Sequence, residues 1–130
     1  MVGLDTNILA RFFAEDDPAQ SQRADDLLQS LTREAPGFIS LVSLAELVWV
    51  LRSQYHLAKD RLIECLERLL DSPELVVESD AAVSQALHLF SSSKADLADC
   101  LIERCGHHAG CRQTVTFDVE ASKFAGMRLL

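Results

Sequence analysis

The sequence has few of the features that mark unusual classes of protein. Its 130 residues include only five glycines and three prolines and contain no repeat, which argues against fibrous, low-complexity and disordered chains. No apolar run approaches the roughly 18 residues that span a membrane, and no basic segment followed by an apolar stretch resembles a signal peptide. We therefore expect a single cytoplasmic domain over residues 1–130.

Cysteine and positive charge are also scarce. The four cysteines form no CxxC pair and are too sparse for a disulfide scaffold, so we expect reduced thiols, with Cys65 and Cys100 in the core. The net charge of −8 argues against passive binding of nucleic acid through a basic surface, because neutralised phosphates supply most of such affinity. It does not exclude a nucleic-acid enzyme, since acids around a metal ion add to the negative total.

Short apolar runs alternate with segments of helical periodicity along the whole chain. This alternation predicts a parallel sheet covered by helices on both faces. The expected strands are 2–5, 38–40, 75–78, 114–117 and 127–130, and the expected helices are 6–14, 19–33, 43–51, 58–70, 80–90 and 93–105, with a short helical piece after residue 118. Residues 91–93, three serines, are expected to form a loop.

Four acids lie at the ends of predicted strands or in the first turns of predicted helices: Asp5, Glu46, Asp99 and Asp118. A fifth, Asp96, lies three residues before Asp99, on the same helical face. Ligands of open α/β sheets bind at the carboxyl ends of the strands, where such acids can converge. Several carboxylates together favour a hard divalent cation such as Mg²⁺ or Mn²⁺.

Each acid also has a purely structural interpretation. The segments Ser43 to Glu46 and Ser93 to Asp96 have the spacing of capping boxes, in which serine and acid satisfy the first backbone N–H groups of a helix. Asp5 and Asp118 could be N-caps, and Asp99 could favour a helix N-terminus through the helix dipole. The structural interpretation is the commoner one for any acid alone, and the recurrence of acids at equivalent places favours a shared site.

The sequence around these acids resembles the motifs of PIN-domain ribonucleases, most closely the VapC-type toxins of bacterial toxin–antitoxin pairs. The resemblance covers essentially the whole chain and rests on four segments in order: Leu4-Asp5-Thr6-Asn7, Ser43-Leu44-Ala45-Glu46-Leu47, Ala95-Asp96-Leu97-Ala98-Asp99-Cys100-Leu101-Ile102 and Thr114-Val115-Thr116-Phe117-Asp118. It implies a Rossmann-like α/β/α sandwich and Mg²⁺- or Mn²⁺-dependent endoribonuclease activity. It also implies a homodimer and a cognate antitoxin that covers the site.

The resemblance assigns roles by position. Asp5, Glu46, Asp99 and Asp118 match the family's catalytic and metal-binding acids, and Asp96 matches an additional acid found in some members; of Asp96 and Asp99 we favour Asp99 as the direct ligand. The hydrogen-bonding residues that would support the carboxylates are Asn7, Thr116 and Thr6. Arg11 is a candidate for contact with substrate phosphate, although an exposed helix arginine is more often only solvated.

Other functions are less well supported by the sequence. The runner-up is a catalytically silent PIN-like module that binds RNA or protein. A Rossmann-like phosphatase would need a second aspartate where Asn7 stands. Cys105, His107, His108 and Cys111 include zinc-ligand residue types, but their spacing is poor and a helix end with exposed histidines is the more ordinary interpretation. No GxSxG or glycine-rich phosphate loop occurs.

The segment that carries Trp49 is strongly apolar. We expect the helix that includes Val48, Trp49, Val50 and Leu51 to be deeply buried, because such residues more often lie in a core than on an interface. Phe12 and Phe13 carry the same ambiguity, and in the resembled family the early helices form the groove that receives the antitoxin.

Overall fold

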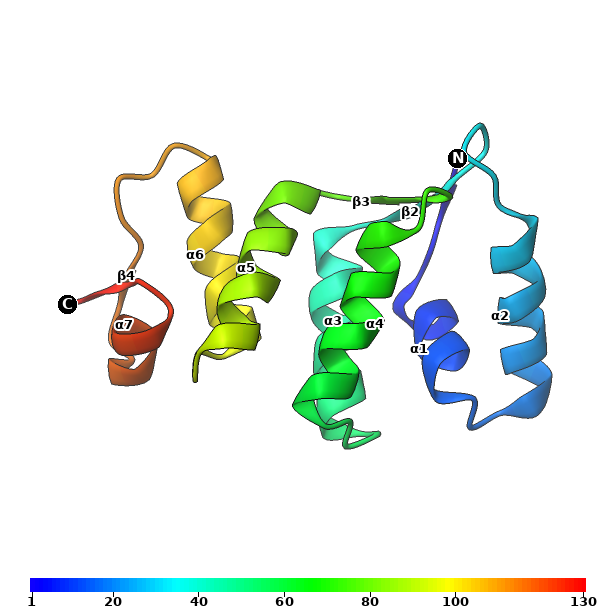
Figure 1. The fold of residues 1–130 in the computed structure, drawn as a ribbon, viewed down its shortest axis with the longest axis horizontal. Helices are drawn as coiled ribbons and strands as arrows, with labels where there is room; N and C mark the ends of the chain where they lie inside the picture. Colours follow the sequence, from blue (N-terminus) through cyan, green and yellow to red (C-terminus); the bar gives the residue numbers. More distant parts are fainter. The chain divides into compact units, whose positions relative to one another are not determined.

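The computed structural model describes all 130 residues (Figure 1). The chain divides into two compact units, unit 1 (Met1–Glu78) and unit 2 (Ser79–Leu130), and each is described by itself. Both units are mixed α/β with parallel strands, which confirms the predicted fold class. That residues 1–130 act as one domain stays a prediction.

Unit 1 contains a small parallel sheet and four helices (Figure 1). Its elements are β1 (Val2–Gly3), α1 (Thr6–Ala14), α2 (Pro18–Ser30), β2 (Gly37–Ile39), α3 (Leu41–Ser53), α4 (Lys59–Asp71) and β3 (Leu75–Val77). The strand order is β1-β2-β3, with Val2 paired to Gly37 and Ile39 paired to Val77. Because all three strands run the same way, their carboxyl ends meet at one edge of the sheet.

Leucine side chains pack closely around a glycine at the centre of this sheet. A Cβ atom at Gly37 would lie 2.8 Å from side-chain carbons of both Leu31 and Leu4. The buried residues of unit 1 come from the sheet and from all four helices, so that the helices are fixed by packing rather than by helix propensity. The fully buried large side chains are Leu9, Ile39, Leu44, Leu47, Leu51, Leu62, Leu66 and Leu69.

The prediction that α3 is deeply buried is only half right. Leu44, Leu47 and Leu51 are buried at helical spacing, as expected for one face of a helix. Trp49, however, is 62% exposed and Val42 is 79% exposed. The sequence shows an apolar helix, but one face of that helix does not contribute to the core.

Unit 2 is built from a helix pair and a two-stranded parallel sheet. Its elements are α5 (Asp80–Ser92), α6 (Leu97–His108), β4 (Val115–Thr116), α7 (Val119–Phe124) and β5 (Arg128–Leu129). α5 packs against α6, and α7 connects β4 to β5, whose register pairs Val115 with Arg128. α5 includes two of the three serines predicted to be a loop, because the hydroxyls of Ser91 and Ser92 donate to the His88 carbonyl within the last turn.

The cysteine prediction is confirmed where the structure tests it. All four cysteines are free, and Cys65 and Cys100 are buried. Burial raises the pKa of the Cys65 thiol. The pKa of Cys100 is raised to about 11, by burial first and then by the negative charges of Asp96, Asp99 and Glu103. Both thiols are therefore protonated at neutral pH and behave as small apolar core residues.

Candidate active site

Asp5 lies at the carboxyl edge of the unit 1 sheet. The Leu4 backbone N–H donates to the Phe38 carbonyl at 2.9 Å, which extends the β1 pairing to the residue before Asp5. Asp5 then occupies the N-cap position of α1, with extended backbone angles, but its side chain accepts no capping hydrogen bond. Its carboxylate is exposed and does not cap α1, so the purely structural interpretation of Asp5 as a helix cap is not supported.

Thr6 and Asn7 follow Asp5 in the first turn of α1. Thr6 is 3% exposed, and its hydroxyl donates to the Ser43 carbonyl at 3.5 Å, so it connects α1 to the first turn of α3. Asn7 is exposed and its side-chain amide makes no hydrogen bond. Neither residue contacts a carboxylate within unit 1, so their role in orienting the acids stays a prediction.

The capping box predicted for Ser43 and Glu46 is wrong. α3 begins two residues before Ser43, and its N-cap is Ser40, whose hydroxyl accepts from the Ser43 N–H at 3.1 Å. A further N-terminal donor, the Leu41 N–H, is satisfied at 2.8 Å by the Glu78 carboxylate, which follows β3. Glu46 is exposed and takes no part in capping, so the structural interpretation of this acid is removed.

Glu46 and Asn7 lie along one cavity of unit 1. The cavity has a volume of about 310 Å³ and is formed by α1, α3 and the residues after α3; its lining residues are Asn7, Ala10, Arg11, Glu46, Trp49, Val50, Gln54 and Tyr55. Three sequence-predicted site residues, Asn7, Arg11 and Glu46, therefore come together in space. The shared cavity follows from the packing of α1 against α3.

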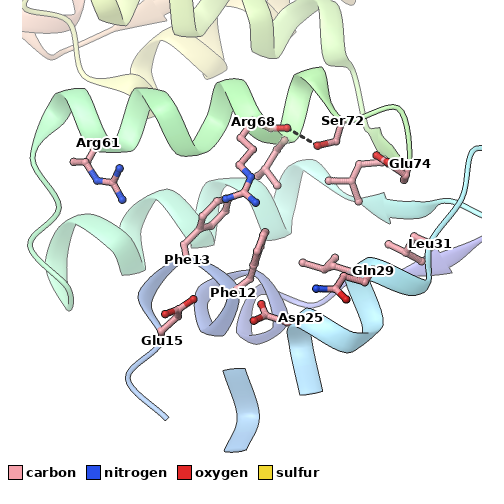
Figure 2. Close-up of a pocket in the computed structure, with 13 residues that line it drawn as sticks. Phe12, Phe13, Glu15, Asp25, Gln29, Leu31, Arg61, Arg68, Ser72 and Glu74 are labelled. Carbon is pink, nitrogen blue, oxygen red and sulfur yellow. Dashed lines mark hydrogen bonds between the residues drawn. The ribbon is translucent and has the colours of Figure 1, made fainter. Parts of the chain in front are cut away.

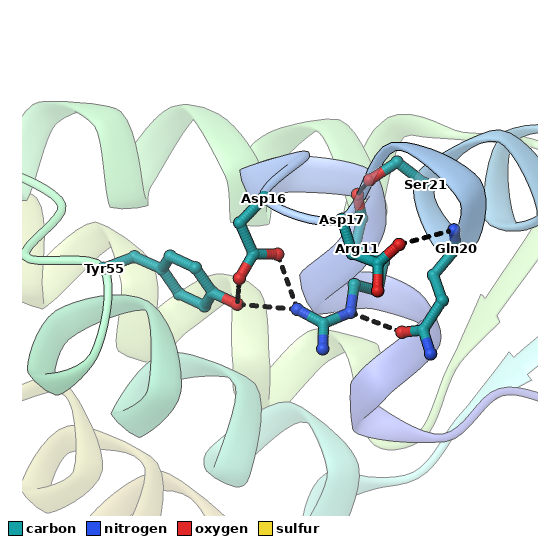
Figure 3. A network of polar contacts seen from close by, with 6 residues as sticks. All are labelled: Arg11, Asp16, Asp17, Gln20, Ser21 and Tyr55. Atoms are coloured by element: carbon teal, nitrogen blue, oxygen red, sulfur yellow. Dashed lines mark hydrogen bonds and ion pairs between the residues drawn. The ribbon is translucent and has the colours of Figure 1, made fainter.

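Arg11 is held in a polar network at the wall of this cavity (Figure 3). Its Nη1 donates to the Asp16 carboxylate and to the Tyr55 hydroxyl, and the Tyr55 hydroxyl donates to Asp16 at 2.8 Å. Its Nε donates to the Gln20 side chain at 2.7 Å. The hydrogen bond from Tyr55, and then that from Arg11, holds the pKa of Asp16 below its usual value.

The network changes the interpretation of Arg11. Asp16 compensates the guanidinium charge, and the side chain is fixed against α2 and the end of α3. A phosphate would have to compete with this carboxylate for Arg11. Sequence reasoning missed the network because Tyr55 is separated from Arg11 by 44 positions, and no local pattern joins them.

The second predicted capping box, Ser93 with Asp96, is also wrong. α6 begins at Leu97, and Asp96 is itself the N-cap, its Oδ1 accepting from the Asp99 N–H at 3.2 Å. The Ser93 hydroxyl instead accepts from the Ala95 N–H and donates to the Leu89 carbonyl at the end of α5. Asp96 is therefore a helix cap, but of a different kind from the one that its spacing predicted.

Asp99 is the electrostatically perturbed acid of unit 2. It lies half-buried in the first turn of α6, and its carboxylate makes no hydrogen bond. Its pKa is raised above the usual aspartate value, by burial first and then by the negative charges of Asp96 and Asp118. These acids, separated by up to 22 positions in the sequence, thus lie close enough to repel one another.

Asp118 is the N-cap of α7. Its Oδ1 accepts from the N–H groups of Glu120 and Ala121 at 2.8 and 3.1 Å, so the structural interpretation holds for this acid too. The Thr116 hydroxyl accepts from the Asp118 backbone N–H at 3.0 Å. Thr116 therefore contacts the backbone of Asp118, and its predicted role in orienting the carboxylate stays a prediction.

The acids fit a hard cation by their chemistry. The donors are carboxylate oxygens, which Mg²⁺ and Mn²⁺ prefer. The pKa of Asp99 is raised first by burial and then by the charges of Asp96 and Asp118, and a bound cation would oppose both effects. Asp5 and Glu46 belong to unit 1, and Asp96, Asp99 and Asp118 belong to unit 2. No group of three or more His, Cys, Asp or Glu side chains in the structure is arranged to hold a metal ion by itself.

The two histidines at the end of α6 contact each other and a neighbouring side chain. The rings of His107 and His108 meet edge to face, with their centroids 5.8 Å apart, and His108 Nε2 lies 3.0 Å from the Gln85 side-chain oxygen. A Cβ atom at Gly106 would lie 2.9 Å from the Thr114 hydroxyl, so the helix end packs closely on the segment before β4.

Comparison with known protein families settles the membership of the chain. The model of the PIN domain matches residues 2–127. The chain belongs to the PIN domain family. The match runs through both units, and PIN domains are typically nucleases that commonly use divalent metals and bind RNA. No curated protein matches the chain closely enough to be named as a relative.

One further surface of this PIN domain bears on its partners. A groove of about 720 Å³ lies among α1, α2, α4 and β3, and Phe12 and Phe13 are among its lining residues (Figure 2). The two phenylalanine rings stack at 5.1 Å, and the Arg68 guanidinium lies 4.6 Å from the centre of the Phe12 ring.

None of the helices is both long and apolar enough for a membrane span.

Proposed function

We propose that this PIN domain is a Mg²⁺-dependent endoribonuclease, able to use Mn²⁺, and the VapC-type toxin of a type II toxin–antitoxin pair. Asp5, Glu46, Asp99 and Asp118 are its metal-binding acids. The observation that carries the proposal is the PIN family match over residues 2–127, in a family whose members are typically nucleases. Beside it stands Asp99, which lies half-buried without a hydrogen bond and near enough to Asp96 and Asp118 for their charges to add to the effect of burial on its pKa.

The proposal requires both units to act as one PIN domain. Unit 1 supplies Asp5 and Glu46, whose carboxylates are exposed and take no part in capping. Unit 2 supplies Asp99 and Asp118, with Asp96 as a further candidate ligand. The continuous family match over residues 2–127 supports treating residues 1–130 as a single domain.

The chain's own residues have distinct tasks in this hydrolysis. Backbone N–H groups fix the Asp118 carboxylate while leaving its second oxygen available, and the Asp99 carboxylate is held in a half-buried position free of hydrogen bonds. Bound Mg²⁺ would supply a Lewis acid that activates water and neutralises charge on the phosphodiester. The direct ligand of the Asp96 and Asp99 pair is Asp99 in this proposal, because Asp96 is engaged as a cap.

The partner of the toxin is an antitoxin segment that lies in the groove among α1, α2 and α4. Phe12, Phe13 and Leu28 line this groove and offer apolar contacts. Charges of both signs lie at the same groove, positive on Arg61 and Arg68 and negative on Glu15, Asp25 and Glu74 (Figure 2). Such a mixed surface suits an amphipathic peptide segment. A homodimer is part of the same proposal and rests on the family resemblance.

The decisive test is cleavage of purified total RNA by the full chain with Mg²⁺, with Mn²⁺ and with EDTA. Wild type should give defined fragments only with metal, and Asp5→Asn, a near-isosteric loss of one charge, should give none. Sequencing of the fragment ends then identifies the substrate. If the wild type cuts nothing while still binding RNA or a protein, the catalytically silent module replaces the nuclease.

A further inference from the structure

The cavity between α1 and α3 adjoins a candidate metal ligand but is not accounted for by metal binding. Glu46 lines it, and Trp49 lies three residues further along α3, on the same helical face. Asn7 and Arg11 line it from α1 with the four-residue spacing of helical neighbours. Its volume of about 310 Å³ is at the lower end of the range for small-ligand cavities, which suits one nucleoside.

Trp49 is the feature of this cavity that core packing does not explain. It is the only tryptophan of the chain, and 62% of its surface is exposed, although α3 buries three leucines on another face. A large exposed aromatic residue next to a candidate catalytic acid offers a flat π surface. Nucleobases stack on such surfaces in proteins that bind single-stranded nucleic acid.

The other lining residues offer groups that can read a base edge. The side-chain amides of Asn7 and Gln54 make no hydrogen bonds within the protein, and each provides both donors and an acceptor. Tyr55 and Arg11 are hydrogen-bonded to Asp16 and to each other, so this wall of the cavity is organised by contacts within the protein (Figure 3). Because Asp16 compensates Arg11, the cavity is better suited to a base than to a second phosphate.

We propose that this cavity binds one unpaired nucleobase of the RNA substrate, which stacks on Trp49 beside the phosphodiester to be cut. The amides of Asn7 and Gln54 would contact the edge of the base and make the choice of cleavage site depend on sequence. This inference rests on the proposed nuclease function. It requires an unpaired base at this position, because a base paired in a helix cannot enter.

Binding can be measured without cleavage, because Trp49 is the only tryptophan and its fluorescence should change when a base stacks on it. Short single-stranded oligomers of A, C, G and U are titrated separately into the full chain in EDTA, and the Trp49 fluorescence is followed. We expect saturable quenching that differs among the four oligomers. A duplex of the same length should quench much less, and equal quenching by duplex would overturn the inference.

Variants then separate stacking from general RNA binding. Trp49→Ala should weaken the binding of a dye-labelled oligomer by about 5- to 100-fold, the usual cost of removing one stacking platform, whereas Trp49→Phe should keep most of the affinity. Val42→Ala is the matched control, since Val42 is 79% exposed on the same helix and does not line the cavity. Unchanged affinity in Trp49→Ala would refute the inference.

The remaining outcomes distinguish this inference from the proposed nuclease function. If RNA is cut with metal and the fragment ends of Trp49→Ala are identical to those of wild type, the nuclease stands and the base site fails. If no RNA is cut but base-dependent quenching is seen, the base site stands and the nuclease fails. If Trp49→Ala instead turns a dimer into a monomer in sedimentation, Trp49 is a protein contact and the inference is wrong.

Discussion

The two units contribute their acids in different ways. In unit 1 the candidate acids Asp5 and Glu46 are exposed and cap nothing, although both lie at places where a cap was expected. In unit 2, Asp96 caps α6 and Asp118 caps α7. The pKa of Asp99 is raised by burial first and then by the charges of these two acids. A change of an acid in unit 1 should therefore affect function alone, whereas a change in unit 2 should affect function and stability together.

The largest expected effect on stability comes from changes in the cores of the two units, and it shows whether the units unfold together or separately. Leu47 is fully buried in α3 of unit 1, and Leu101 is buried in α6 of unit 2. Either residue changed to Ala should cost roughly 2–5 kcal/mol, because a cavity replaces a packed side chain. For a single PIN domain, each variant should lower the midpoint of one common transition, followed by circular dichroism in urea.

The opposite result would be equally clear. If Leu47→Ala shifts one phase of a two-phase transition and Leu101→Ala shifts the other, the units fold independently. The prediction of a single domain would then be wrong, and the acids of the two units would lack a fixed common geometry.

Loss of cleavage should be shared by both units. Glu46→Gln and Asp99→Asn each remove one charge with little change of shape, and each should lower the rate of RNA cleavage by roughly 10²-fold or more, a usual effect of removing one electrostatic group from an active site. Rates are compared under single-turnover conditions at equal Mg²⁺. Full activity in either variant would remove that acid from the proposed site.

Removing a candidate acid should lower the free energy of unfolding more in unit 2, where the acid caps a helix, than in unit 1. Asp118→Ala removes the acceptor of two backbone N–H groups and should cost roughly 0.5–2 kcal/mol, whereas Asp5→Ala, which removes no capping hydrogen bond, should cost much less. Urea unfolding measures both. Asp118→Asn is the control, since asparagine can still cap: it should stay stable but lose cleavage.

The smallest expected effect is the change in stability of Asp99→Asn, and this change should depend on pH. The raised pKa of Asp99 in the folded state means that ionisation destabilises the fold, a penalty absent below the unfolded value of about 3.9 and complete above the folded pKa. Asp99→Asn should therefore be more stable than wild type at pH 7 without metal, and this gain should disappear as the pH falls to about 3.

Added Mg²⁺ provides the control for this last prediction. Metal bound to the folded state should stabilise wild type at pH 7 and should stabilise Asp99→Asn much less. Equal stabilisation of the two proteins would show that Asp99 is not a ligand. Thermal unfolding with and without EDTA makes the comparison.

The sequence predicted most elements because they depend on local patterns. The alternation of short apolar runs with helical periodicity predicted the order of strands and helices. The expected helices 6–14 and 19–33 correspond to α1 and α2, and the structure adds that Asp17 caps α2. The two capping boxes failed because serine and acid spacing is also compatible with a helix that begins elsewhere. At α3, Ser40 and Glu78 satisfy the first turn instead.

By itself, the sequence determined the α/β class and the candidate acids, because backbone periodicity and short motifs act over a few residues. Only the tertiary structure decided which acids cap helices and that Arg11 is held by Asp16 and Tyr55. It also decided that burial, and then the charges of Asp96 and Asp118, raise the pKa of Asp99. It also decided that Trp49 is exposed beside Glu46 rather than buried. These facts depend on contacts between residues far apart in the chain, which no local pattern contains.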